Sequence, residues 1–99
     1  MPPLDEDEVY HELYIHLVWS THDQKTSIAP SISYTLYHYI ADLILNRNCS
    51  PIAGKIFSDH LQLIIKFHPD VVLEDLIKDI KLGSALWLKT HYDLTDFAW

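Results

Sequence analysis

The 99-residue sequence has one cysteine, one arginine, two glycines and no long apolar run. Cys49 alone cannot form an internal disulfide, and without a second cysteine there is no thiolate cluster for zinc. No stretch approaches the roughly 20 apolar residues of a membrane span, and the N-terminus lacks the basic and then apolar order of a signal peptide. We therefore expect a cytoplasmic protein without a membrane segment.

Basic residues are scarce as well. Seven lysines and arginines stand against fourteen acidic residues, and the formal net charge is −7. Affinity for a phosphate backbone comes mainly from lysine and arginine, and Arg47 is the one side chain of the type that makes bidentate phosphate contacts. Because five of the acidic residues precede Leu13, the remainder is closer to neutral. The composition therefore opposes strong nucleic-acid binding without excluding it.

The length and the 48% hydrophobic content are enough for one modest core. Residues 1–12 combine two prolines with a run of acidic residues, so they have little to bury and are predicted to form an acidic, mobile tail. Residues 13–99 carry the apolar patterns of regular structure. They are predicted to form a single folded domain.

The apolar pattern of this domain changes between a period of two and a helical period. Asp70 is predicted to cap the helix that begins at about residue 71. The order of elements predicts an α+β, ferredoxin-like fold, in which two helices cover one face of an antiparallel sheet. The predicted elements are a strand over 9–21, a helix from Pro30, strands over 52–57 and 60–67, a helix from about 71, and the start of a fourth strand at 97–99.

The strand that follows the turn Ser58-Asp59 holds the most informative residues. His60 and Gln62 fall on one face, and the apolar residues from Leu61 alternate with them. A ring nitrogen and an amide oxygen two residues apart on a strand can share one divalent cation. The simpler interpretation is that His60 is an ordinary surface histidine, and that Asp59 anchors the turn instead of holding the His60 ring.

The segment Ser58-Asp-His-Leu-Gln-Leu-Ile-Ile65 resembles the Pro-Asp-His-hydrophobic-His-Leu-Leu-Val segment of the single-tyrosine HUH transposases, the insertion-sequence two-hundred-like family. Ile15 to Thr21 is similar to the first strand of that family. Lys81 with Ser84-Ala-Leu-Trp-Leu88 is similar to its Lys-x-x-Ser-Ser-Arg-Trp-Leu helix, and Phe97-Ala-Trp99 to the start of its last strand. The resemblance covers nearly the whole chain.

The resemblance implies a weakly bound divalent metal, Mg or Mn, at His60 and Gln62, with His16 and Asp59 as possible supporting groups around it. For His16, the simpler interpretation is an ordinary hydrogen bond without any ligand. Lys25 and Lys81 are the implied DNA contacts. The implied partners are single-stranded or hairpin DNA and a second copy of the chain.

Three departures from the family pattern concern its chemistry. Gln62 stands where the second histidine is usual, and Leu86 replaces the arginine of the helix. The family's catalytic tyrosine lies on a helix that would follow Trp99, and Tyr92 does not match its position. We therefore expect a degenerate, catalytically inactive remnant that retains a transposase-like, DNA-binding fold.

Two other functions are compatible with the sequence. One is a non-catalytic protein-interaction or homodimerisation module, which the acidic charge and the missing arginine favour. The other is an unrelated ferredoxin-like domain that binds a small molecule. The second possibility requires the similar segments to be a coincidence.

Overall fold

A computed structural model describes residues 12–22 and 28–99 of the chain. The acidic tail predicted at the N-terminus, apart from Glu12, lies outside these residues. Glu12 is described, and its carboxylate lies 3.6 Å from the ammonium of Lys66. The elements, in chain order, are β1 (Leu13–Ser20), α1 (Pro30–Asn46), β2 (Ser50–Ile56), β3 (His60–Phe67) and α2 (Leu73–Tyr92).

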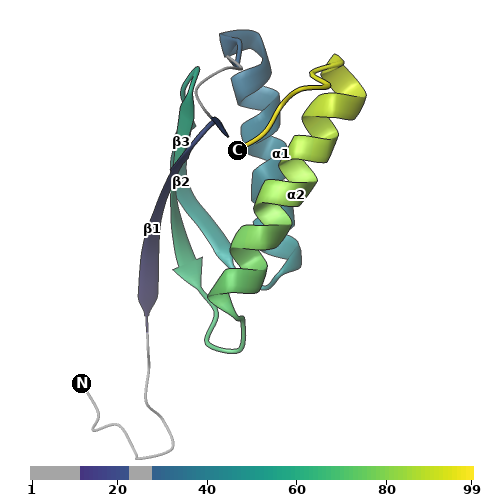
Figure 1. The fold of residues 1–99 in the computed structure, drawn as a ribbon. Helices are drawn as coiled ribbons and strands as arrows, with labels where there is room; N and C mark the ends of the chain where they lie inside the picture. Colours follow the sequence, from purple (N-terminus) through teal and green to yellow (C-terminus); the bar gives the residue numbers. More distant parts are fainter. Residues whose placement is uncertain (1–11, 23–27) are drawn as a thin grey trace, which may run out of the picture.

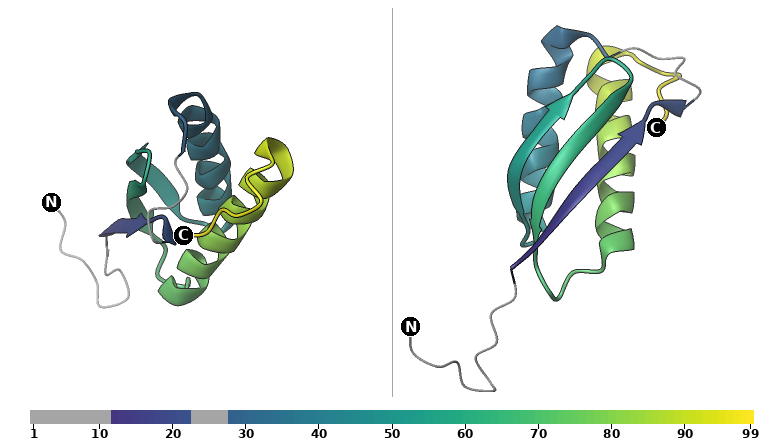
Figure 2. Two further views of the ribbon diagram at one scale, coloured as in Figure 1. Left: turned by 45° about the horizontal axis from the view of Figure 1, so that its top comes forward. Right: turned by 90° about the vertical axis from the view of Figure 1, so that its left-hand side faces the viewer.

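The three strands form one antiparallel sheet in the order β1-β3-β2, so β3 is the central strand. Both helices lie on the same face of this sheet, and the other face is left open (Figures 1 and 2). This arrangement confirms the predicted fold class, α+β with an antiparallel sheet and two helices on one face. No helix of the described residues is long and apolar enough to cross a membrane.

The period of two in β1 and β3 separates a buried face from an open face. Leu61, Leu63 and Ile65 of β3 are each at most 1% exposed, whereas Ile64 between them is 38% exposed. In β1, Leu17 is buried and Val18 is exposed. Because a slip of one residue would exchange the two faces, burial of one face specifies this register.

The two helices bury their apolar stripes against the sheet and against each other. α1 contributes Leu36, Ile40 and Ile44, and α2 contributes Leu76, Ile80 and Leu88. α2 continues through Gly83, where a Cβ atom would lie 3.0 Å from Cδ1 of Leu43, so the glycine permits a close approach of the helices. Between the helices, Arg47 also forms an ion pair with Asp79.

Gly54 of β2 allows α1 to approach the sheet closely. A Cβ atom at this position would lie 2.6 Å from Cε2 of Tyr37 and 2.9 Å from the backbone oxygen of Gln62. A backbone oxygen in the centre of a sheet cannot move away without breaking strand pairing. Glycine is therefore required here by space, because its φ is not positive.

The prediction that a fourth strand starts at residues 97–99 is wrong. Phe97 to Trp99 form no strand, and one backbone hydrogen bond, from His22 N–H to the oxygen of Ala98, links this segment to the end of β1. The segment returns from α2 toward the sheet (Figure 1). Phe97 is 1% exposed, so burial of its ring in the core decides the path of the chain.

The predicted cap of the second helix is also wrong. Val72 is the N-cap of α2, and it makes no side-chain hydrogen bond to the helix. The N–H of Asp70 donates to Nδ1 of His68, which holds Asp70 in the preceding turn. The first helix ends at Asn46, and Asn48 just after it adopts the left-handed conformation with a φ of 62°.

Candidate functional site

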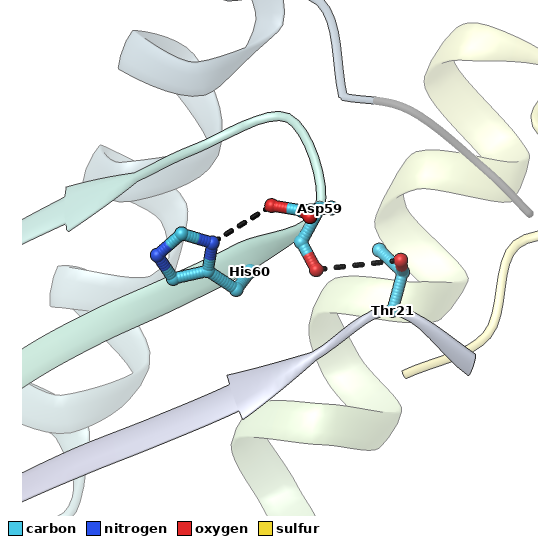
Figure 3. A network of polar contacts seen from close by, with 3 residues as sticks. All are labelled: Thr21, Asp59 and His60. Carbon is cyan, nitrogen blue, oxygen red and sulfur yellow. Dashed lines mark hydrogen bonds and ion pairs between the residues drawn. The ribbon is translucent and has the colours of Figure 1, made fainter. Parts of the chain in front are cut away.

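Asp59 joins the start of β3 to the end of β1. Its carboxylate oxygen Oδ1 lies 2.8 Å from Nδ1 of His60. Its backbone oxygen accepts a hydrogen bond of 2.8 Å from the N–H of Thr21, and the Thr21 hydroxyl lies 3.4 Å from the same oxygen. Figure 3 shows Asp59 between the other two residues. The residue thus anchors the turn and also contacts the His60 ring, the two roles that the sequence left open.

The ring of His60 is held on a second side by Phe57. The two rings are stacked with centroids 4.2 Å apart and an interplanar angle of 9°. The ammonium of Lys55 lies 4.9 Å from the centroid of the Phe57 ring. With Nδ1 turned to Asp59, the other ring nitrogen, Nε2, is the one that can bind a ligand.

Gln62 lies beside His60 along the open face, two residues further in β3. It is opposite Val18 of β1 and Lys55 of β2. His16 is opposite Ile64, one row further along. The structure thus brings His16 onto the same face as Gln62 and His60, as the fold implied by the resemblance requires.

The two lysines expected to contact DNA do not join this site. Lys25 lies outside the described residues. Lys81 belongs to α2 and its ammonium lies 5.3 Å from the centroid of the Trp19 ring. Because Trp19 lies on the helix-covered face of β1, Lys81 is separated by the sheet from His60 and Gln62.

Sequence reasoning missed two residues of the open face, Lys55 and Phe57. The signal that could have found them is weak, because Ser50–Ile56 is short and contains a register shift between Pro51 and Ala53. Such an irregularity breaks the period of two from which a face is assigned. The cation at Lys55 becomes visible as a neighbour of Gln62 only when the strands are paired.

No curated protein matches this chain. A solved structure, that of a candidate transposase from Deinococcus radiodurans R1, is similar with a TM-score of 0.81 at 19% identity, over 94% of this chain and 70% of that one. At this identity the likeness shows the fold. The family model described as "Transposase IS200 like" matches residues 9–99. Since this match spans nearly the whole sequence, the chain belongs to the IS200-like transposase family.

Proposed function

We propose that this member of the family binds single-stranded or hairpin DNA on the open face of its sheet. The observation that carries the proposal is a separation of charge. The three strands contain no aspartate or glutamate, although the formal net charge of the chain is −7. The strands therefore carry a formal charge of +2, from Lys55 and Lys66. The helices, on the opposite side, carry four carboxylates and three lysines, a formal charge of −1: Asp42, Glu74, Asp75 and Asp79 against Lys78, Lys81 and Lys89.

The open face offers cations and hydrogen-bond donors to a phosphate backbone. Lys55 and Lys66 lie on it, together with the rings of His16 and His60. Glu12, just before β1, partly offsets Lys66. Two lysine contacts to a single strand give a slope of log K against log salt of about −1.4, at about −0.7 per contact. The expected binding is therefore weak and readily abolished by salt.

A divalent metal fits the donors present at His60. The contact of Asp59 with Nδ1 leaves Nε2 as a ligand, and the carboxamide oxygen of Gln62 suits Mg or Mn. Within the described residues, no group of three or more His, Cys, Asp or Glu side chains could hold a metal ion. Two neutral ligands form an incomplete site, so we expect weak binding. When bound, such a metal polarises a phosphodiester.

The first experiment measures fluorescence anisotropy of a labelled single-stranded oligonucleotide while manganese is raised through the millimolar range. We expect manganese to tighten DNA binding by the unmodified protein, with half of the effect at millimolar concentration. His60→Ala should bind DNA but lose the response to manganese, because it removes the ring that Asp59 orients. His38→Ala, on the exposed side of α1, is the matched control and should respond normally.

Two results would contradict this proposal. One is the absence of DNA binding at low salt with or without manganese. The other is a manganese response that His60→Ala leaves unchanged, since the metal would then be bound elsewhere.

A second function, homodimerisation, is supported by the outer edge of β1. This strand has a partner on one side only among the described residues, and its Leu13, Tyr14 and Val18 side chains are at least half exposed. Unpaired backbone groups at an edge can pair with a second copy across a two-fold axis. We expect light scattering to find dimers at high micromolar concentration. A monomer under these conditions would refute this route to self-association.

A third possibility, an unrelated domain that binds a small molecule, is contradicted by the family match over residues 9–99. The similar segments are therefore not a coincidence.

A further inference from the structure

We infer that a hollow on the open face binds one phosphodiester of single-stranded DNA, next to the proposed metal ligands. This inference rests on the proposed function and adds a specific subsite to it. All three strands contribute to the hollow, which is lined by His16, Ala53, Gly54, Lys55, Gln62 and Ile64.

The strand register explains why the hollow exists. Lys55 and Gln62 are opposite each other in one row, and Ala53, Ile64 and His16 form the next row. Neighbouring strands are about 4.8 Å apart, so residues from the two outer strands are about 10 Å apart across β3. On the open face of β2, Ala53 contributes only a methyl group at this point. Gly54 lines the hollow with its backbone, because its missing Cβ would face Tyr37 of α1.

The polar groups around the hollow are donors without competing carboxylates. Within the described residues, neither His16 nor Gln62 has a side-chain hydrogen-bond partner, and Lys55 contacts the Phe57 ring instead of an acid. No aspartate or glutamate lines the hollow. An ammonium, an imidazole and a carboxamide together can donate hydrogen bonds to the oxygens of one phosphodiester.

Gln62 connects the hollow to the proposed metal site. A carboxamide has an oxygen that can bind a metal and an NH₂ group that can donate to a phosphate at the same time. The exposed side chains of Val18 and Ile64 offer apolar surface next to these donors, which suits the sugar or base of the same nucleotide. A single lysine is a weak site for free phosphate, so the occupant is a strand that also contacts neighbouring positions.

The test is carried out without metal, in the presence of a chelator, on the full chain. Binding of a short oligothymidylate is followed by anisotropy and by the backbone amide signals in NMR spectra. Lys55→Gln and His16→Ala should each weaken binding by about three- to tenfold, and Lys55→Gln should reduce the salt slope by about 0.7. Lys78→Gln, an exposed lysine of α2, is the matched control and should change affinity less than twofold.

The probes separate a DNA strand from a free phosphate. Oligothymidylate should shift the amide signals of Ala53, Gly54 and Gln62, whereas inorganic phosphate and thymidine monophosphate should bind far more weakly. Equal binding of inorganic phosphate and the oligonucleotide at these amides would overturn the inference, as would equal effects of Lys55→Gln and Lys78→Gln. If manganese still tightens DNA binding through His60 while the hollow variants bind normally, the inference fails and the proposed function stands. If no oligonucleotide binds under any condition, both fail.

Discussion

Replacing Phe97 by alanine should lower the free energy of unfolding by about 3 to 5 kcal/mol, the usual cost of removing a buried aromatic ring. Phe97 is 1% exposed and contacts the ring of Trp99 edge to face, with centroids 4.8 Å apart. Trp99 in turn packs against Trp19 and donates a hydrogen bond of 2.8 Å from Nε1 to the buried hydroxyl of Ser84. Loss of the Phe97 ring should therefore loosen the segment that joins α2 to β1.

Urea unfolding followed by circular dichroism measures this effect. Leu86→Ala is the matched control, because Leu86 is 65% exposed and alanine is a good helix former, so its unfolding free energy should change by less than about 0.5 kcal/mol. A loss below 1 kcal/mol in Phe97→Ala would show that the segment is not part of the core. Since small domains have about 5 to 15 kcal/mol of stability, the expected loss is a large fraction of the total.

We expect no covalent protein–DNA product when the chain is incubated with a hairpin oligonucleotide and manganese. Attack by a tyrosine needs its oxygen about 3 to 3.5 Å from the phosphorus. Tyr14 of β1 is opposite Lys66 of β3, whereas Ser20 of β1 is opposite His60. Tyr14 and Ser20 are six residues apart along β1, so Tyr14 lies about 20 Å from His60.

The other described tyrosines lie on the helices, across the sheet from the His60 ring. Three belong to α1, and among them Tyr37 presses against Gly54 from the helical side. Tyr92, at the end of α2, contacts the Trp87 ring with centroids 5.2 Å apart. No tyrosine of the described residues is therefore in position to attack a phosphate bound near His60.

A denaturing gel of a labelled hairpin with a single-stranded flank shows whether a covalent protein–DNA band forms. A protein-linked band that disappears in Tyr14→Phe or Tyr92→Phe would prove the expectation wrong and identify the nucleophile. His60→Ala serves as the control for metal dependence, because a band that persists in this variant would not arise from the proposed site.

Several features of this protein follow from the sequence alone, because they depend on neighbours within a few residues. The alternation around Leu17 and Leu63 assigned the buried faces of β1 and β3, since successive side chains of a strand point to opposite sides. The left-handed conformation of Asn48 is similarly local. The contact of Asp59 with His60 also joins sequence neighbours, but the sequence left open whether Asp59 holds this ring or only anchors the turn. The family itself is visible in the short segments that contain these residues.

Other features were decided only by the tertiary structure, because they depend on which distant residues meet. Phe97 to Trp99 are as apolar as a strand start, but Phe97 gains more by entering the core than by extending the sheet. Lys81 turned to the Trp19 ring on the covered face, away from Gln62. Lys55 became a neighbour of Gln62 through the pairing of β2 with β3. Periodicity describes one element at a time, whereas burial and strand pairing are set by the whole chain folding together.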